Sequence, residues 1–186
     1  MNIILVGPDG SGKSTLAHAL GEALRYAIVH TQWEMFGRNK IQEAYGFEHM
    51  MLVSDNHIIM DRHTALESMA YRKHFSYEVP TPKKPYLDVF SYRHNLLVYL
   101  TYDPKEIAER KGDDEHIHMI KTVHQDFEST LQKQGFRLYG TSVSRPTYVT
   151  VDTTEMTVNE AVHYILSHIP VEHLTKAPDR GFSKSE

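Results

Sequence analysis

A glycine-rich loop between two segments of different periodicity constrains the fold of this chain more than any other feature. Residues 7–14 are GPDGSGKS, which fits the pattern G-x-x-x-x-G-K-[ST]. The apolar run at residues 2–6 comes before the loop and is typical of a strand buried on both faces. Residues 13–25 follow it with apolar side chains at helical spacing. The sequence therefore predicts a strand, a tight loop and a helix in direct succession.

A loop in this position is suited to binding phosphate groups. Its backbone N–H groups turn inwards around an anion, and the start of the helix adds a partial positive charge. We expect Lys13 to reach the β- and γ-phosphates of ATP and the Ser14 hydroxyl to ligand Mg²⁺. The predicted ATP-binding residues are Gly10, Ser11, Gly12, Lys13, Ser14 and Thr15.

The rest of the chain alternates between strand-like and helix-like segments. Further strands are expected at 26–31, 58–60, 96–100 and 148–151, and helices at 38–53, 64–72, 86–94, from 104 onwards, 115–134 and 158–168. This alternation predicts an α/β fold, a doubly wound five-stranded parallel sheet with helices on both faces. The charged break at 110–114 predicts a short lid, and a proline-rich loop is expected at 76–85. We expect one domain over 1–170 and a loosely held polar tail over 171–186.

Composition excludes several classes of protein. The chain has 40% hydrophobic and 24% charged residues, which excludes a disordered or collagen-like protein. It has no cysteine, so a disulfide, a thiolate metal site and a cysteine nucleophile are excluded. No apolar run is long enough for a membrane span, and the net charge of −4 argues against a long nucleic acid as partner. We expect a cytoplasmic protein with a small-molecule substrate.

Other sequence patterns exclude or favour particular kinds of chemistry. A GTPase would need Asn-Lys-x-Asp after a later strand, and the only Asn-Lys pair, at 39–40, is followed by Ile-Gln. The small size and the charged break before a long helix favour a phosphotransferase with a lid. A zinc site is not expected among five of the histidines, because they do not share one helix face with a carboxylate: His116, His118, His163, His168 and His173.

Four further segments, together with Asp9 inside the loop, give the chain a resemblance to the thymidylate kinases. IIMDRH at 58–63 with SMAY at 68–71 is similar to that family's strand-ending Asp-Arg and the helix after it. VYLTYDP at 98–104 is similar to its fourth strand and Asp-Pro cap, and RKGDDE at 110–115 to its lid. The resemblance spans about 1–168. It implies a P-loop nucleoside monophosphate kinase of nucleotide biosynthesis that uses ATP and Mg²⁺, and it implies a homodimer.

The catalytic residues expected from these patterns are Lys13, Arg62, Arg110 and Asp9. Phosphoryl transfer needs cations around the transferred group, and Lys13 and Arg110 would supply them, the latter on lid closure. Arg62 follows the third strand beside the loop, where a bidentate guanidinium suits the acceptor phosphate. Asp61 is expected to hold a Mg²⁺-bound water. The resemblance implies that Asp9 faces the acceptor sugar.

Base recognition is expected to involve aromatic side chains near the acceptor. Trp33, Phe36 and Tyr71 are candidates for stacking on a base. Arg72 stands where the resembled family has a glutamine that contacts thymine, and it is a candidate for reading a carbonyl of the base. The predicted acceptor is therefore a deoxynucleoside monophosphate that carries thymine or a different or modified base.

Two alternatives to a monophosphate kinase are open on the sequence. A kinase of the same fold could phosphorylate a hydroxyl of a nucleoside or nucleic acid end, which needs a carboxylate base. Glu34, just after the second strand, is the candidate for that base, and Asp9 and Asp61 could also serve. A protein that binds ATP as a switch, without transfer, is the other alternative. The combination of Asp9 with Asp61 and Arg62 favours the monophosphate kinase.

Overall fold

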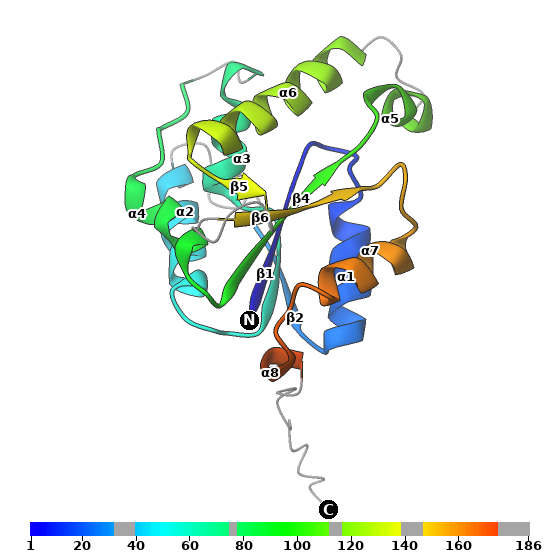
Figure 1. Ribbon diagram of the computed structural model, residues 1–186. Helices are drawn as coiled ribbons and strands as arrows, with labels where there is room; N and C mark the ends of the chain where they lie inside the picture. The colour runs from blue at the N-terminus through cyan, green and yellow to red at the C-terminus, as the bar shows by residue number, and fades with distance from the viewer. Residues whose placement is uncertain (32–39, 75–77, 112–116, 139–146, 175–186) are drawn as a thin grey trace, which may run out of the picture.

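The structure, a computed structural model, describes residues 1–31, 40–74, 78–111, 117–138 and 147–174 (Figure 1). A twisted parallel sheet runs through the middle of this part of the chain, with helices on both sides. The predicted α/β doubly wound architecture is confirmed.

The described sheet has the strand order β2-β3-β1-β4-β6-β5, and each paired strand runs parallel to its neighbour. The strands are β1 (Asn2–Val6), β2 (Ala27–His30), β3 (Ile58–Asp61), β4 (Asn95–Thr101), β5 (Arg137–Leu138) and β6 (Thr147–Asp152). All five predicted strands are present. The additional strand, β5, was not predicted because two residues are too few for a periodic pattern to be visible.

Eight α-helices connect and flank these strands within the described ranges. They are α1 (Lys13–Leu24), α2 (Ile41–Leu52), α3 (Thr64–Ala70), α4 (Lys84–Asp88), α5 (Pro104–Lys111), α6 (Ile117–Lys133), α7 (Val158–Leu166) and α8 (Val171–Leu174). Short 3₁₀ turns follow α3 at Arg72–His74 and α4 at Val89–Ser91.

Two local predictions were wrong. The helix expected at 86–94 is instead α4 followed by a 3₁₀ turn, and α4 begins earlier, with Lys84 and Pro85 in its first turn. Proline is tolerated there because the first N–H groups of a helix make no hydrogen bond within the helix. The tail was expected to be loosely held from residue 171, but α8 forms there, and the backbone carbonyl of His173 accepts a hydrogen bond from the Tyr26 hydroxyl at 3.1 Å. The domain boundary at residue 170 stays a prediction.

Alternating side chains of the strands pack against different helices. Ile3 and Leu5 of β1 face α1 and α7, in a cluster with Leu20 and Ile165. Ile4 and Val6 face the other way, in a cluster with side chains of α2, α3 and α6 such as Phe127. Figure 1 shows these two layers on either side of the sheet. Because β1 is buried on both faces, its residues 3–6 form a continuous apolar run.

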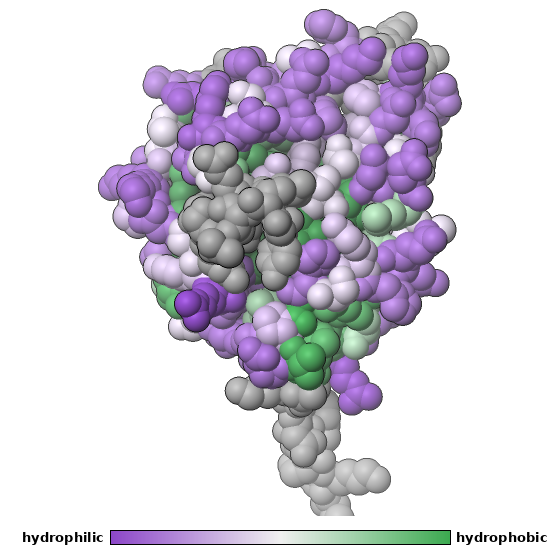
Figure 2. All heavy atoms as spheres, in the orientation of Figure 1, coloured by the Kyte–Doolittle hydropathy of each residue, from purple (hydrophilic) through white to green (hydrophobic). Residues whose placement is uncertain are grey.

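The surface seen in Figure 2 is mostly hydrophilic over α5 and α6, the helices at the top of Figure 1. A small apolar patch lies low in the same view, near α8, where Val171 and Leu174 are exposed. Within the part of the chain that the structure describes, no helix combines the length and the apolar character needed to cross a bilayer.

Candidate active site

Three segments that follow neighbouring strands meet at one edge of the sheet. β1 pairs with β3 on one side and β4 on the other. The loop of residues 7–12 follows β1, Arg62 follows β3, and Tyr102 follows β4. The carboxyl ends of parallel strands are where α/β proteins bind their ligands. The sequence-predicted loop and Arg62 are therefore brought to one place.

The backbone of the loop depends on glycine at two positions. At Gly7, an added Cβ would lie 2.5 Å from the carbonyl oxygen of Leu100, so no larger residue fits. Gly12 is the N-cap of α1 and has φ +84°, a conformation that residues with a side chain rarely adopt. No side chain caps α1, in contrast to α7, where Thr157 and Glu160 form a capping box. The first N–H groups of α1 are thus left to a ligand.

Lys13 lies within the loop and is buried, with 4% of its surface exposed. Its Nζ donates hydrogen bonds to the carbonyl oxygens of Gly7 at 2.6 Å and Pro8 at 2.9 Å. Burial lowers the pKa of Lys13 below its ordinary value, and the nearby carboxylate of Glu67, whose Oε1 is 3.9 Å from Nζ, opposes this effect. The ammonium group is held where a phosphate bound by the loop would contact it.

Arg62 has an unusual backbone for a residue with a side chain, at φ +91°. Its backbone N–H donates to the carbonyl of Leu5 at 3.1 Å, which fixes it beside the end of β1. Its Nη1 lies 3.1 Å from Asp9 Oδ1 and 3.3 Å from Glu67 Oε2. Strained backbones of this kind are concentrated at functional sites, and here the strain accompanies a guanidinium that lies against the loop.

Glu67 lies between the two cations and was not predicted from the sequence. One carboxylate oxygen faces Lys13 and the other faces Arg62. Burial raises the pKa of Glu67 to about 6, although both cations act in the opposite direction. The signal in the sequence was a single acidic residue in the apolar helix that begins two residues after Arg62. Glu67 joins Lys13 and Arg62 into one charged cluster.

Asp61, the residue predicted to hold a Mg²⁺-bound water, has one paired and one unpartnered carboxylate oxygen in the described structure. It is the last residue of β3, 3% exposed, and its Oδ2 lies 2.9 Å from His30 Nδ1. Its other oxygen, Oδ1, is buried and has no hydrogen-bond partner in the described structure. Ser14 is exposed on the first turn of α1. A hydroxyl and a carboxylate are the hard oxygen ligands that Mg²⁺ prefers, so these residues fit the ion.

Two tyrosines hold the tip of the loop around Asp9. The backbone N–H of Asp9 donates to the Tyr71 hydroxyl at 2.7 Å, and the Tyr102 hydroxyl lies 3.5 Å from the Asp9 carbonyl. The Tyr71 ring packs edge-on against Phe127 of α6, with ring centroids 5.5 Å apart. Tyr71 therefore positions the loop through its hydroxyl group. Its predicted stacking on a base stays a prediction.

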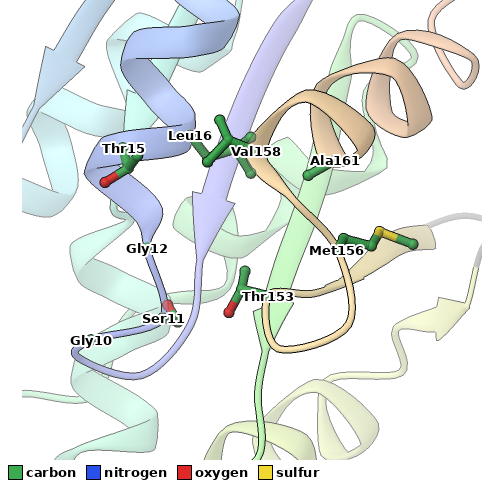
Figure 3. A pocket seen from close by; sticks show the side chains of 9 residues that line it. All are labelled: Gly10, Ser11, Gly12, Thr15, Leu16, Thr153, Met156, Val158 and Ala161. Atoms are coloured by element: carbon green, nitrogen blue, oxygen red, sulfur yellow. The ribbon is translucent and has the colours of Figure 1, made fainter. Parts of the chain in front are cut away.

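A pocket lies on the other side of the loop, between α1 and α7 (Figure 3). Four predicted ATP-binding residues line it: Gly10, Ser11, Gly12 and Thr15. Leu16 of α1 also lines it, and the rest of the lining consists of residues that the sequence did not single out: Thr153, Met156, Val158 and Ala161. These four belong to α7 and the segment after β6, so only the tertiary structure places them against the loop.

The remaining predicted site residues contribute less to this arrangement. Trp33, Glu34 and Phe36 lie outside the described residues. Arg110 belongs to α5, but its side chain is outside the described part of the structure. Arg72 is exposed, and its Nη1 donates to the Thr81 hydroxyl at 2.9 Å. The roles predicted for these residues stay predictions.

A fully buried carboxyl group supports the start of α3, behind the site. Glu48 of α2 is 0% exposed and accepts hydrogen bonds from the Thr31 hydroxyl at 2.6 Å and the Thr64 N–H at 2.7 Å. Burial raises the pKa of Glu48 to about 7, although these hydrogen bonds oppose the effect. Since Thr64 begins α3, Glu48 acts as a cap from outside the helix and fixes the segment that carries Arg62 and Glu67.

Replacing Glu48 by glutamine is expected to change how stability depends on pH. Folding raises the pKa of this carboxyl from 4.5 to about 7, so its contribution to stability is complete below about pH 4.5 and is lost as pH rises through 7. Relative to Glu48→Gln, the wild type should lose up to about 3 kcal/mol of unfolding free energy between pH 4.5 and pH 8. Urea unfolding at several pH values measures this difference.

The control for that comparison is Glu43→Gln, on an exposed side chain of the same helix. His63 titrates in the opposite sense, because burial lowers its pKa to about 3, but it is present in all the proteins compared. A difference between wild type and Glu48→Gln that stays constant with pH would contradict the prediction.

The sheet, the loop and the buried lysine together define the α/β P-loop NTPase fold, and solved structures show the same fold. No protein-family model and no curated protein matches the sequence. The YorR protein of Bacillus subtilis, solved with phosphorylated GDP, is 24% identical with a TM-score of 0.72, over 93% of this chain and 98% of that one.

Two further solved structures are similar over most of both chains. Thymidylate kinase of Candida albicans is 19% identical with a TM-score of 0.56, over 93% of this chain and 92% of that one. Deoxyadenosine kinase of M. mycoides, solved with dCTP, is 17% identical with a TM-score of 0.53, over 90% and 98%. Similarity at this level of identity shows the fold.

Proposed function

We propose that the protein is an ATP- and Mg²⁺-dependent kinase that transfers the γ-phosphoryl group to a deoxynucleoside monophosphate. The observation that carries this proposal is the charged cluster of Lys13, Arg62 and Glu67 beside the uncapped start of α1. The loop is suited to binding the triphosphate of the donor. Arg62, the second cation of the cluster, is suited to binding a phosphate on the acceptor. The thymidylate kinase and the deoxyadenosine kinase compared above have the same fold.

The donor nucleotide is proposed to lie along the loop with its base in the pocket between α1 and α7. The pocket walls are apolar at Leu16, Met156, Val158 and Ala161, which suits the faces of a purine ring. The phosphates would lie against the backbone of residues 10–15. Mg²⁺, held by Ser14 and through Asp61, would supply charge neutralisation between the phosphates. Lys13 would contact the transferred group.

The acceptor is proposed to bind on the Arg62 side of the loop. A guanidinium offers two parallel N–H donors to a phosphate, and Arg62 is held within reach of the loop by Asp9 and Glu67. An acceptor phosphate would displace these carboxylates from the guanidinium. A monophosphate already carries an ionised oxygen, so the reaction needs converging cations and no strong base. The identity of the base, whether thymine or another, is left to the assay below.

A hydroxyl kinase is the second candidate, and one observation favours it. Asp61 has a buried, unpartnered oxygen at the end of β3, and a carboxylate there could accept a proton from a nucleoside hydroxyl. The similarity to a structure titled as deoxyadenosine kinase is consistent with this candidate. A homodimer, a cytoplasmic location and a role in nucleotide biosynthesis stay predictions.

An assay of ATP conversion to ADP over a panel of deoxynucleosides and their monophosphates separates these candidates. We expect turnover with one or more monophosphates, dependent on Mg²⁺ and abolished by EDTA. Turnover with nucleosides alone would overturn the monophosphate proposal in favour of the hydroxyl kinase. Binding of ATP without turnover of any acceptor would favour a nucleotide-binding switch.

Placing a charge in the base pocket is expected to weaken ATP binding. Val158 is 42% exposed at the start of α7 and lines the pocket, so Val158→Glu should leave the fold intact. We expect the KM for ATP to rise about tenfold, since a carboxylate is poorly accommodated against an apolar ring. Asn159→Glu adds the same charge at the next, exposed residue outside the pocket lining and should leave this KM unchanged. Equal effects of the two changes would contradict the pocket's role.

A further inference from the structure

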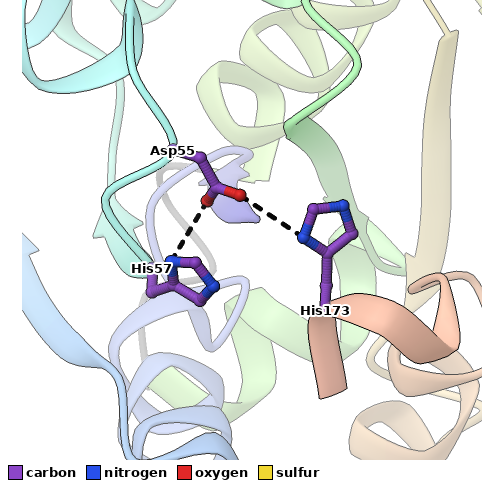
Figure 4. A group of neighbouring side chains, drawn as sticks. All are labelled: Asp55, His57 and His173. Carbon is purple, nitrogen blue, oxygen red and sulfur yellow. Dashed lines mark ion pairs between the residues drawn. The ribbon is translucent and has the colours of Figure 1, made fainter. Parts of the chain in front are cut away.

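Three side chains with metal-binding atoms meet at the opposite end of the sheet from the phosphate loop (Figure 4). Asp55 and His57 come from the segment between α2 and β3, and His173 comes from α8. One ligand atom of each lies within 4.8 Å of the others. The two His Nδ1 atoms each lie 3.3 Å from a different carboxylate oxygen of Asp55. Residues 55 and 173 are thus brought together by the fold alone.

The backbone and a tyrosine hold the two imidazoles in place. His57 has φ +53°, the left-handed conformation that residues with a side chain rarely adopt. The Tyr26 ring packs edge-on against the His57 ring, with centroids 5.3 Å apart, and its hydroxyl donates to the backbone carbonyl of His173. The His57 Nδ1 faces Asp55, while its Nε2 is buried and unpartnered in the described structure. Tyr26 therefore holds the His57 ring and the backbone of His173 beside the carboxylate.

We propose that Asp55, His57 and His173 form a binding site for a divalent transition-metal ion, with Zn²⁺ as the closest match. Two imidazoles and a carboxylate are a ligand set that Zn²⁺ accepts, whereas Mg²⁺ and Ca²⁺ prefer oxygen ligands. One ligand atom from each of the three side chains lies within 4.8 Å of the others, so a small shift of the side chains brings them to the separations of about 3.3 Å that a tetrahedral Zn²⁺ site needs. An ion bound there would displace the Met1 ammonium group, which contacts Asp55 and His173.

Binding at this site would tie α8 to the segment between α2 and β3. The site lies next to the amino end of β1, where the Met1 amine nitrogen contacts both Asp55 and His173. The phosphate loop follows the other end of that strand. The ion would therefore stabilise the position of the C-terminal helix without taking part in phosphoryl transfer. This separates the site from the Mg²⁺ proposed at Ser14 and Asp61.

The test uses the full chain, stripped with EDTA, dialysed against ZnCl₂ and then freed of unbound metal. The wild type is expected to retain one Zn²⁺ per chain by elemental analysis and to melt at a higher temperature with Zn²⁺ than without it. Asp55→Asn, His57→Ala and His173→Ala are each expected to weaken Zn²⁺ binding at least tenfold and to lose the thermal shift. His163→Ala, an exposed histidine of α7 outside the cluster, is the matched control and should behave as the wild type.

A second measurement keeps the result independent of variant stability. In the wild type, NMR of ¹⁵N-labelled imidazoles should show the His57 and His173 rings responding to Zn²⁺ and not to equimolar Mg²⁺. Retention of no zinc by the wild type would overturn the proposal, as would equal retention by His57→Ala and His173→Ala. Kinase activity enters neither measurement, so failure here is distinguishable from failure of the proposed function.

Discussion

Replacing Lys13 by methionine is expected to lower the rate of phosphoryl transfer by about a thousandfold. Methionine keeps an unbranched apolar side chain of similar length in the buried position but removes the ammonium group. That group is held by the carbonyls of Gly7 and Pro8, at 2.6 and 2.9 Å, beside the loop backbone that would bind the triphosphate. Loss of one preorganised charge at a transition state costs about 10²–10³ in kcat, and a buried cation lies at the upper end. Steady-state kinetics with the best acceptor of the panel measures the effect.

The control for Lys13→Met is Lys84→Met, which removes an exposed lysine that pairs with Asp88 on α4. Its kinetics should match the wild type. Circular dichroism and thermal unfolding of both variants would establish that the folds are intact. A Lys13→Met protein that is folded and retains more than about a tenth of the wild-type rate would contradict the assignment of the loop as the phosphate site.

Replacing Arg62 by alanine is expected to lower kcat/KM for the monophosphate acceptor by at least about thirtyfold, while the KM for ATP changes little. The guanidinium is held by Asp9 and Glu67 against the loop, and its removal leaves those two carboxylates facing the acceptor phosphate. Removing one partner of a charge pair from which the bound acceptor excludes water costs about 2–5 kcal/mol, which is about thirtyfold or more. Turnover should be compared with the monophosphate and with its parent nucleoside.

Arg62→Gly separates the effect of charge from the effect of the backbone. The backbone φ of +91° at this position is less favourable for alanine than for glycine. The free energy of unfolding should therefore be about 1 kcal/mol higher for the glycine variant than for the alanine variant. Both variants should show the same loss with the monophosphate. Arg93→Ala, at an exposed position before β4, is the control and should be neutral. An equal loss of ATP turnover when no acceptor is present would remove Arg62 from the acceptor site.

Local sequence patterns were sufficient to predict the architecture of the protein. The apolar run of β1 shows that this strand is buried on both faces, and the helical spacing after Lys13 shows which face of α1 is apolar. Within the loop between them, the glycine at position 12 is required by the local backbone, because it needs a positive φ. These constraints act within a few residues of each other, so they are visible in one sequence.

The partners of the site residues were decided by the tertiary structure. Glu67 was missed because nothing near it in the sequence indicates that it will lie between Lys13 and Arg62. Tyr71 was predicted as a stacking residue, but its hydroxyl is also a hydrogen-bond acceptor for the loop, which depends on how α3 packs. The pocket wall from Thr153 to Ala161 approaches the loop only because β6 and α7 lie beside β4 and α1.

The cluster of Asp55, His57 and His173 shows most clearly which contacts only the tertiary structure decides. Histidine spacing along the chain predicted no zinc site, since spacing detects only ligands that share one helix face. His173 instead meets Asp55 and His57 across more than a hundred positions of sequence, through the packing of α8 beside Tyr26. The sequence determined the strands, helices and phosphate loop, because their signals are local. Only the fold determined which charges and ligands face one another, because those contacts join distant parts of the chain.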